Sequence, residues 1–101
     1  MNFKETNMNY ANFSLASIEK VAFEDTSLRN SNFQENKLKN IIYNKADLTQ
    51  AQIFKTSLKD IDLSNSNIEG IAVSIEDIKG AIINQFQAID IMYLLGVKIK
   101  Q

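Results

Sequence analysis

The residue types that most often carry out catalysis near neutral pH are scarce in this chain. It contains no histidine and no cysteine, which excludes imidazole acid–base chemistry, thiolate nucleophiles and thiolate zinc sites. Carboxylates form three close pairs: Glu24 with Asp25, Glu76 with Asp77, and Asp60 with Asp62. Such pairs are usually solvated turn residues, so we predict that no residue is catalytic and that the chain is not an enzyme.

The remaining polar features do not indicate a phosphate, nucleic-acid or membrane ligand. Gly70, Gly80 and Gly96 match no phosphate-binding loop. The basic cluster at 37–39 lacks interleaved aromatic residues, and the net charge of the chain is −1. No long apolar run or signal peptide is present. We therefore expect a cytoplasmic protein with no cofactor, no metal ion, no small-molecule substrate, no direct nucleic-acid contact and no membrane contact.

The chain is built of repeated five-residue units, and the position of a residue in its unit decides whether its side chain points inward or outward. Each fifth position from Phe3 to Val73 holds a large apolar residue, and the position two before it is small or apolar except at Asn36. Period five fits neither an α-helix nor a plain strand. It fits a short extended piece with two inward side chains, followed by a tight corner at which Asn and Ser can bond the neighbouring backbone.

A longer period of twenty residues lies on top of the short one. Aromatic residues recur in two columns, Phe3, Phe23 and Tyr43 in the first and Phe13 and Phe33 in the second. Four units per circuit make a square coil, in which like residues stack about 4.8 Å apart. The sequence therefore predicts an all-β solenoid, a quadrilateral parallel β-helix of about four coils over residues 1–83.

These units resemble the pentapeptide-repeat family, whose signature is Ala, then Asp or Asn, then Leu and two further residues. The closest matches are Ala46-Asp47-Leu48, Ala11-Asn12-Phe13, Ser31-Asn32-Phe33 and Ser66-Asn67-Ile68. The resemblance implies that the β-helix is right-handed.

The repeat is expected to end before a terminal helix. Glu76 occupies an inward position, so we expect the coil to loosen over 74–79. Asn84 and Gln87 form a capping pair for a helix over 85–95, and Gly96 is placed to end it. Residues 97–99 are a candidate last strand. Residues 84–101 are thus predicted to form a capping and dimerisation segment.

The expected helix is apolar on more than one side. One stripe can cover the open end of the coil, and the other needs a second cover, either a loop of the same chain or, as we predict, a second copy. The predicted homodimer interface comprises Phe86, Ile89, Met92, Tyr93, Leu95, Val97 and Ile99.

The segment 77–88, with 94–97 beyond it, is similar to the C-terminal tail of the quinolone-resistance (Qnr) subgroup of the family. The resemblance implies a homodimer that binds a type II topoisomerase (DNA gyrase or topoisomerase IV), modulates quinolone sensitivity and imitates B-form DNA. The four sides of the coil, however, carry net charges of only about −2, −1, 0 and +1, whereas duplex DNA carries a charge about every 1.7 Å. A general protein-interaction scaffold and a fragment of a longer repeat protein remain alternatives.

Three apolar residues in outward positions map to one side of the coil, namely Leu15, Phe54 and Ile75. They are a possible docking patch, although scattered exposed apolar residues are common.

Overall fold

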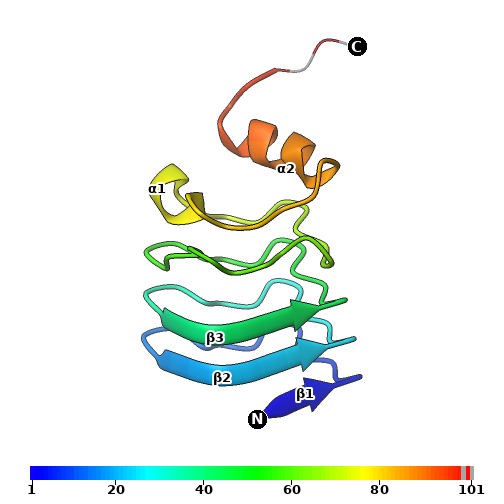
Figure 1. Ribbon diagram of the computed structural model, residues 1–101, viewed down its shortest axis with the longest axis vertical. Coiled ribbons are helices and arrows are strands. Elements are labelled where there is room, and N and C mark those ends of the chain that lie inside the picture. Colours follow the sequence, from blue (N-terminus) through cyan, green and yellow to red (C-terminus); the bar gives the residue numbers. More distant parts are fainter. Residues whose placement is uncertain (99, 101) are drawn as a thin grey trace.

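The chain winds as a right-handed parallel β-helix in the computed structural model, which describes residues 1–98 and 100. Its elements are β1 (Asn2–Lys4), β2 (Ser17–Glu24), β3 (Lys37–Asn44), α1 (Ile75–Ile78) and α2 (Gln87–Leu94). The three strands form a parallel sheet in the order β1-β2-β3. In Figure 1 the near strands run left to right while the chain climbs from its N-terminus, which is right-handed winding.

Each circuit of the coil takes twenty residues, as the sequence predicts. Phe3 is paired with Phe23, and Phe23 with Tyr43, across the sheet. Isolated bridges continue the same register on other sides of the coil, including Asn32 with Gln52. The result is a rod with principal extents of 42 × 25 × 22 Å.

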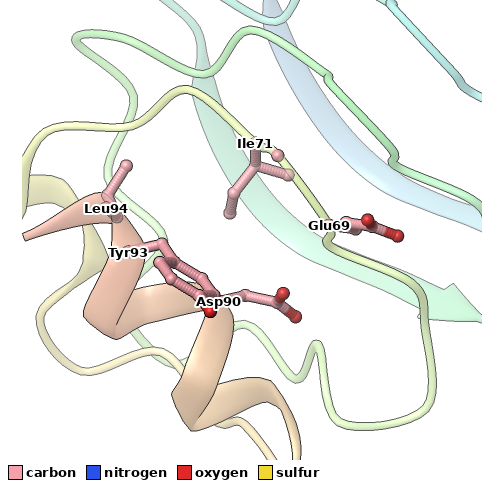
Figure 2. Close-up of a pocket in the computed structure, with 6 residues that line it drawn as sticks. Glu69, Ile71, Asp90, Tyr93 and Leu94 are labelled. Atoms are coloured by element: carbon pink, nitrogen blue, oxygen red, sulfur yellow. The ribbon is translucent and has the colours of Figure 1, made fainter. Parts of the chain in front are cut away.

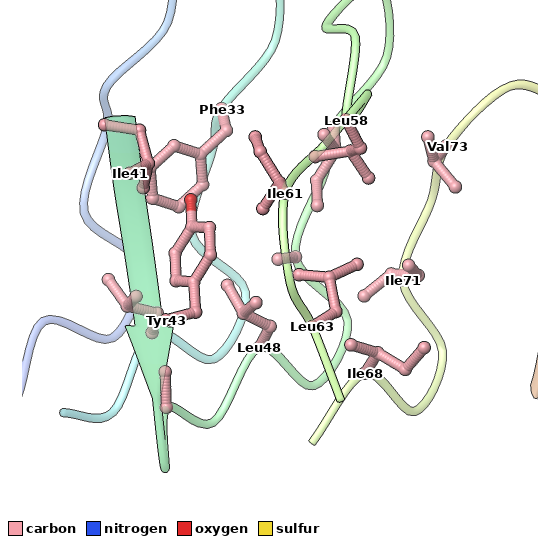
Figure 3. Packing of buried hydrophobic residues seen from close by; sticks show 14 of the residues in the cluster. Phe33, Ile41, Tyr43, Leu48, Leu58, Ile61, Leu63, Ile68, Ile71 and Val73 are labelled. Atoms are coloured by element: carbon pink, nitrogen blue, oxygen red, sulfur yellow. The ribbon is translucent and has the colours of Figure 1, made fainter. Parts of the chain in front are cut away.

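The core consists of the predicted columns of inward side chains (Figure 3). The Phe3, Phe23 and Tyr43 rings are stacked with centroids 5.4 Å apart at each step, and those of Phe13 and Phe33 are 4.8 Å apart. Rings of the two columns meet edge to face, at 6.1 Å between Phe23 and Phe33. Offset stacks and edge contacts are the favourable aromatic geometries, so the two columns also support each other laterally.

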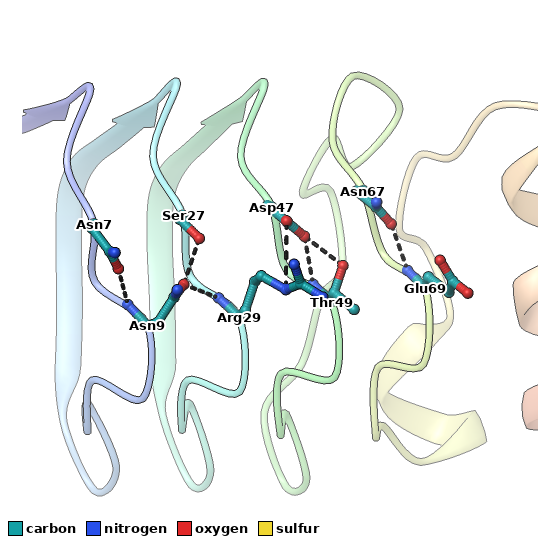
Figure 4. Close-up of polar contacts among 8 residues, drawn as sticks. All are labelled: Asn7, Asn9, Ser27, Arg29, Asp47, Thr49, Asn67 and Glu69. Carbon is teal, nitrogen blue, oxygen red and sulfur yellow. Dashed lines mark hydrogen bonds and ion pairs between the residues drawn. The ribbon is translucent and has the colours of Figure 1, made fainter.

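The corners depend on a left-handed backbone and on local side-chain hydrogen bonds. Residues two positions after the large inward residue have positive φ, for example 64° at Tyr10 and 60° at Leu15. Such values are costly for residues other than glycine. Asn or Asp side chains support many corners by accepting the backbone N–H two residues later at 2.9–3.0 Å (Figure 4), namely Asn7, Asn12, Asn32, Asp47, Asp62 and Asn67.

Polar side chains in inward positions bond to the preceding circuit. The Asn36 amide donates to the carbonyls of Phe13 (2.6 Å) and Ala16 (3.2 Å). The buried Thr56 hydroxyl donates to the carbonyl of Phe33 (2.6 Å) and accepts the N–H of Asn36 (2.9 Å). Hydrogen bonds therefore satisfy the amide nitrogen of Asn36, the one exception to the small or apolar inward series, while its buried Oδ1 has no partner among the described residues.

The backbone ladder is interrupted at one corner, which we call the split corner. No backbone–backbone hydrogen bond joins residues 37–44 to residues 57–64, although both segments are described. Figure 1 draws the circuit that follows β3 without a strand arrow. The ladder resumes beside the split corner, where the N–H of Lys45 donates to the carbonyl of Asn65 (3.0 Å).

The coil loosens where predicted, and it does so by forming the single turn α1. Glu76 is exposed there, and the Ser74 hydroxyl donates to the Asp77 carboxylate at 2.5 Å. A short fifth circuit follows, with Ile82 bridged to Asp62. The helical turn thus removes the carboxylate of Glu76 from the inward position that the repeat would give it.

Helix α2 begins at Gln87, two residues later than predicted. It ends at Leu94, one residue earlier than predicted. Gly96 follows with the left-handed backbone expected of it, φ being 76°, and the N–H groups of Gly96 and Val97 donate to the carbonyls of Tyr93 and Met92. Val97 and Lys98 are not in a strand, and Ile99 lies outside the described residues. Within the described part of the chain, no helix has the length and apolarity needed to cross a bilayer.

Candidate interaction surfaces

Helix α2 has one stripe against the coil and another in solvent. Ile91 and Leu94 pack on the core cluster, and Gln87 is buried. The predicted interface residues other than Ile99, which is outside the described residues, are between 42 and 74 % exposed: Phe86, Ile89, Met92, Tyr93, Leu95 and Val97. No described segment covers this second stripe, which we call the α2 stripe.

A reciprocal pair of hydrogen bonds fixes the start of α2, as the sequence predicts. The Asn84 side chain accepts the Gln87 N–H, and the Gln87 side chain accepts the Asn84 N–H, both at 2.9 Å. The Gln87 amide also donates to the carbonyls of Leu63 (2.6 Å) and Ser66 (2.7 Å). The sequence analysis missed this second role of Gln87. Asn36 could have indicated it, because its amide likewise donates to two carbonyls of the preceding circuit. Gln87 therefore fixes both the start of α2 and the position of α2 on the coil.

A cavity of about 340 Å³ lies between α2 and the last full circuit. Ile71 and Leu94 form apolar walls, while Glu69, Asp90 and Tyr93 bring polar groups to it (Figure 2). Neither carboxylate is in an ion pair with a described residue. The sequence did not indicate this cavity, because Glu69 and Asp90 meet only through the placement of α2.

The carboxylates of Asp47 and Asp62 support corners of the coil. Asp62 accepts the N–H (2.9 Å) and the hydroxyl (2.5 Å) of Ser64, and these hydrogen bonds lower the pKa of its carboxyl group. Asp47 accepts the N–H of Thr49 (3.0 Å) and lies 3.8 Å from Arg29 (Figure 4). The described residues contain no cluster of three or more acidic side chains arranged to hold a metal ion.

The predicted docking patch is exposed but interrupted. Leu15, Phe54 and Ile75 are 75, 44 and 53 % exposed. Leu15 and Ile75 occupy the same corner of the first and fourth circuits, with Glu35 and Lys55 at that corner between them. These two charged residues are paired at 3.4 Å, so a charged strip separates Leu15 from Ile75. The patch stays a prediction.

Comparison with known proteins finds a family similarity in the first third of the chain. A family model described as pentapeptide repeats (8 copies) matches residues 2–34. No curated protein matches the chain.

Solved structures of pentapeptide repeat proteins are similar to the chain at low identity. One from the Arabidopsis thaliana thylakoid lumen is 20 % identical, with 91 % of this chain and 76 % of that chain covered and a TM-score of 0.48. One from the cyanobacterium Cyanothece 51142 is 18 % identical, with 82 % and 60 % covered and a TM-score of 0.43. QnrB1, described as a plasmid-mediated fluoroquinolone resistance protein, is 15 % identical, with 98 % and 58 % covered and a TM-score of 0.32. The chain thus spans 60 % of the Cyanothece chain and 58 to 70 % of the QnrB1 chains.

Proposed function

We propose that this chain, whose residues 2–34 match the pentapeptide-repeat family model, is a pentapeptide-repeat protein that works by binding other proteins and not by catalysis. The observation that carries the proposal is the α2 stripe, which is a set of exposed apolar side chains on a helix fixed to a rigid coil. Apolar surface of this kind on a folded protein commonly marks an interaction site. The rod itself is held by stacked side chains and a backbone ladder, so it presents the stripe in a fixed orientation.

The first partner in this proposal is a second copy of the same chain. A twofold axis beside α2 would bring the Ile89, Met92 and Tyr93 side chains of two copies together, because residues three and four apart share one helix face. Such an interface would cover the surface that no described segment of the chain covers. It would also place the two rods end to end, which leaves their sides available to other partners.

Light scattering on the wild type and on the Met92→Lys, Leu95→Lys double variant tests the dimer. We expect a dimer for the wild type and a monomer for the variant, because two charges would be buried in an apolar contact. The matched control is Leu15→Lys, which adds a charge at an exposed corner residue far from α2. A wild-type monomer at micromolar concentrations would rule out this interface.

Type II topoisomerase is the second partner that we propose to test. Support comes from the resemblance of segments 77–88 and 94–97 to the tail of the Qnr subgroup. The near-neutral sides of the coil argue for contact by shape and apolar surface and against DNA mimicry.

A gyrase supercoiling assay with and without ciprofloxacin tests this partner. Inhibition of supercoiling, or protection from the drug, at micromolar protein would support it. An unchanged reaction in both arms would leave a general interaction scaffold as the function, with the homodimer unaffected.

A further inference from the structure

The split corner leaves backbone groups unpaired, which the repeat pattern does not reveal. At the equivalent position one circuit later, the Leu63 N–H donates to the Ile82 carbonyl (2.8 Å) and the Ile82 N–H donates to the Ile61 carbonyl (2.9 Å). The corresponding bonds at the split corner would run from the Tyr43 N–H to the Asp62 carbonyl and from the Asp62 N–H to the Ile41 carbonyl, and neither bond is formed. Unpaired edges of this kind are the usual template for an added strand.

Backbone hydrogen bonds are missing along both segments that border the split corner, residues 37–44 and residues 57–64. In residues 37–44, the N–H groups of Leu38 and Asn40 lack the bonds that their equivalents Leu58 and Asp60 make to the next circuit (2.8 and 2.9 Å). In residues 57–64, the N–H of Ser57 lacks the bond to the preceding circuit that the N–H of its equivalent Lys37 makes (3.1 Å). Side chains close the two ends, through Thr56 with Asn36 (2.9 Å) and Asn65 with Asn44. The opening is therefore bounded at both ends.

A cleft of about 410 Å³ lies at this corner. Its walls include Ile41, Ile42 and Tyr43, and Ile42 is 58 % exposed. Asp60 and Asp62 also line the cleft, and no basic side chain does so among the described residues. A volume in this range is typical of ligand sites with apolar walls and a few polar groups. The cleft thus combines apolar walls, negative charge and unpaired backbone groups.

We propose that the split corner binds an extended peptide segment of a partner protein that alternates apolar and basic side chains. The backbone of the peptide pairs with the free N–H and carbonyl groups of β3 or of residues 57–64, as in strand addition. Its apolar side chains contact Ile42, and its basic side chains lie beside Asp60 and Asp62. Charge complementarity selects a basic peptide over an acidic one.

The inference rests on the proposed protein-binding function and adds a site to it that is separate from α2. The Met92→Lys, Leu95→Lys variant should therefore bind the peptide as the wild type does. Loss of dimerisation and loss of peptide binding are separate results.

Fluorescence anisotropy with a labelled, amidated Lys-Val-Thr-Val-Lys-Val peptide is the first test. We expect a Kd below about 1 mM, no binding when Glu replaces Lys in the peptide, and none when alternate peptide amides are N-methylated. The Asp60→Asn, Asp62→Asn double variant should bind the Lys peptide about three- to tenfold more weakly. Asn occupies the equivalent corner positions at Asn40 and Asn67, so this variant should fold.

The matched control is Asp47→Asn, Glu69→Gln, which removes the same charge from another side of the coil. Its affinity for the peptide should equal that of the wild type. Equal weakening in both double variants would show a nonspecific charge effect and overturn the site.

Hydrogen exchange measured by NMR supplies the second test. In the free protein, the amides of Tyr43 and Asp62 should exchange faster than those of Leu63 and Ile82, and the peptide should slow the one that belongs to the segment with which it pairs. If Tyr43 and Asp62 are already as protected as Leu63 and Ile82, the corner is closed and the proposal fails. Fast exchange that the peptide leaves unchanged also overturns it.

Discussion

The same two circuits of the coil are joined by a backbone ladder on one flank and by no backbone hydrogen bond at the opposite corner. Between residues 46–55 and 66–75, which we call the closed flank, the ladder includes Leu48 N–H to Asn67 carbonyl (2.8 Å) and Ile53 N–H to Ala72 carbonyl (2.6 Å). At the split corner, segments 37–44 and 57–64 share no backbone bond. Yet Tyr43 and Leu63 are as buried there as Leu48 is on the flank. Inward packing and backbone pairing are therefore separable in this fold.

Core truncation should show the largest difference between the two regions. Leu48→Ala on the closed flank is expected to lower the free energy of unfolding by about 3–4 kcal/mol, and Leu63→Ala at the split corner by only about 2 kcal/mol. Both side chains are fully buried, but the segment at the split corner has no ladder bonds to 37–44 and can move into the vacated space. Urea denaturation measures both values. An equal or larger loss for Leu63→Ala would contradict the comparison.

Removal of one hydroxyl should give the next largest effect. Thr56→Val is expected to cost about 1–2 kcal/mol, because it takes a donor from the Phe33 carbonyl and an acceptor from the Asn36 N–H. Thr26→Val is the matched control, since Thr26 only donates, to the carbonyls of Phe3 and Glu24. Urea denaturation of the two isosteric variants should show the greater loss for Thr56→Val. The reverse order would mean that the side-chain bridge does not hold the end of the split.

Alkaline pH should give the smallest effect. Burial raises the pKa of the Tyr43 phenol above its value in the unfolded chain, so its contribution to stability is complete below about pH 10 and is lost as pH rises above that. Between pH 10 and 11, the wild type should lose up to about 1 kcal/mol more than Tyr43→Phe does. Thermal unfolding of the two proteins across this range measures the difference. Identical pH profiles would show that the phenol ionises without unfolding.

The regular part of the fold could be predicted from the sequence because each unit reports its own geometry. The spacing of Phe3, Phe23 and Tyr43 predicted both the circuit length and the ring stack, and the Asn residues predicted the corner hydrogen bonds. Asn84 and Gln87 predicted the helix start through a local capping pattern. These features depend on residues close together in the sequence or at a fixed spacing, and the repeat shows the same pattern many times.

The split corner and the cavity beside α2 could not be predicted in the same way. The inward residues Ile41 and Tyr43 match the pattern of bonded units, and the ladder depends on the spacing between circuits, which no single unit specifies. The cavity depends on how α2 lies across the coil, which is set by the hydrogen bonds of Gln87 to Leu63 and Ser66. Both features arise from tertiary placement and not from the local pattern.

Because each circuit takes twenty residues, the rod can be lengthened without changing its register only by whole circuits. Insertion of one whole circuit would extend the rod by about 4.8 Å and leave every outward column aligned with itself. Insertion of a single five-residue unit would instead turn everything beyond it by a quarter of a revolution, which would carry α2 to a different side relative to the split corner. The fold can thus act as a ruler that changes distance and direction independently.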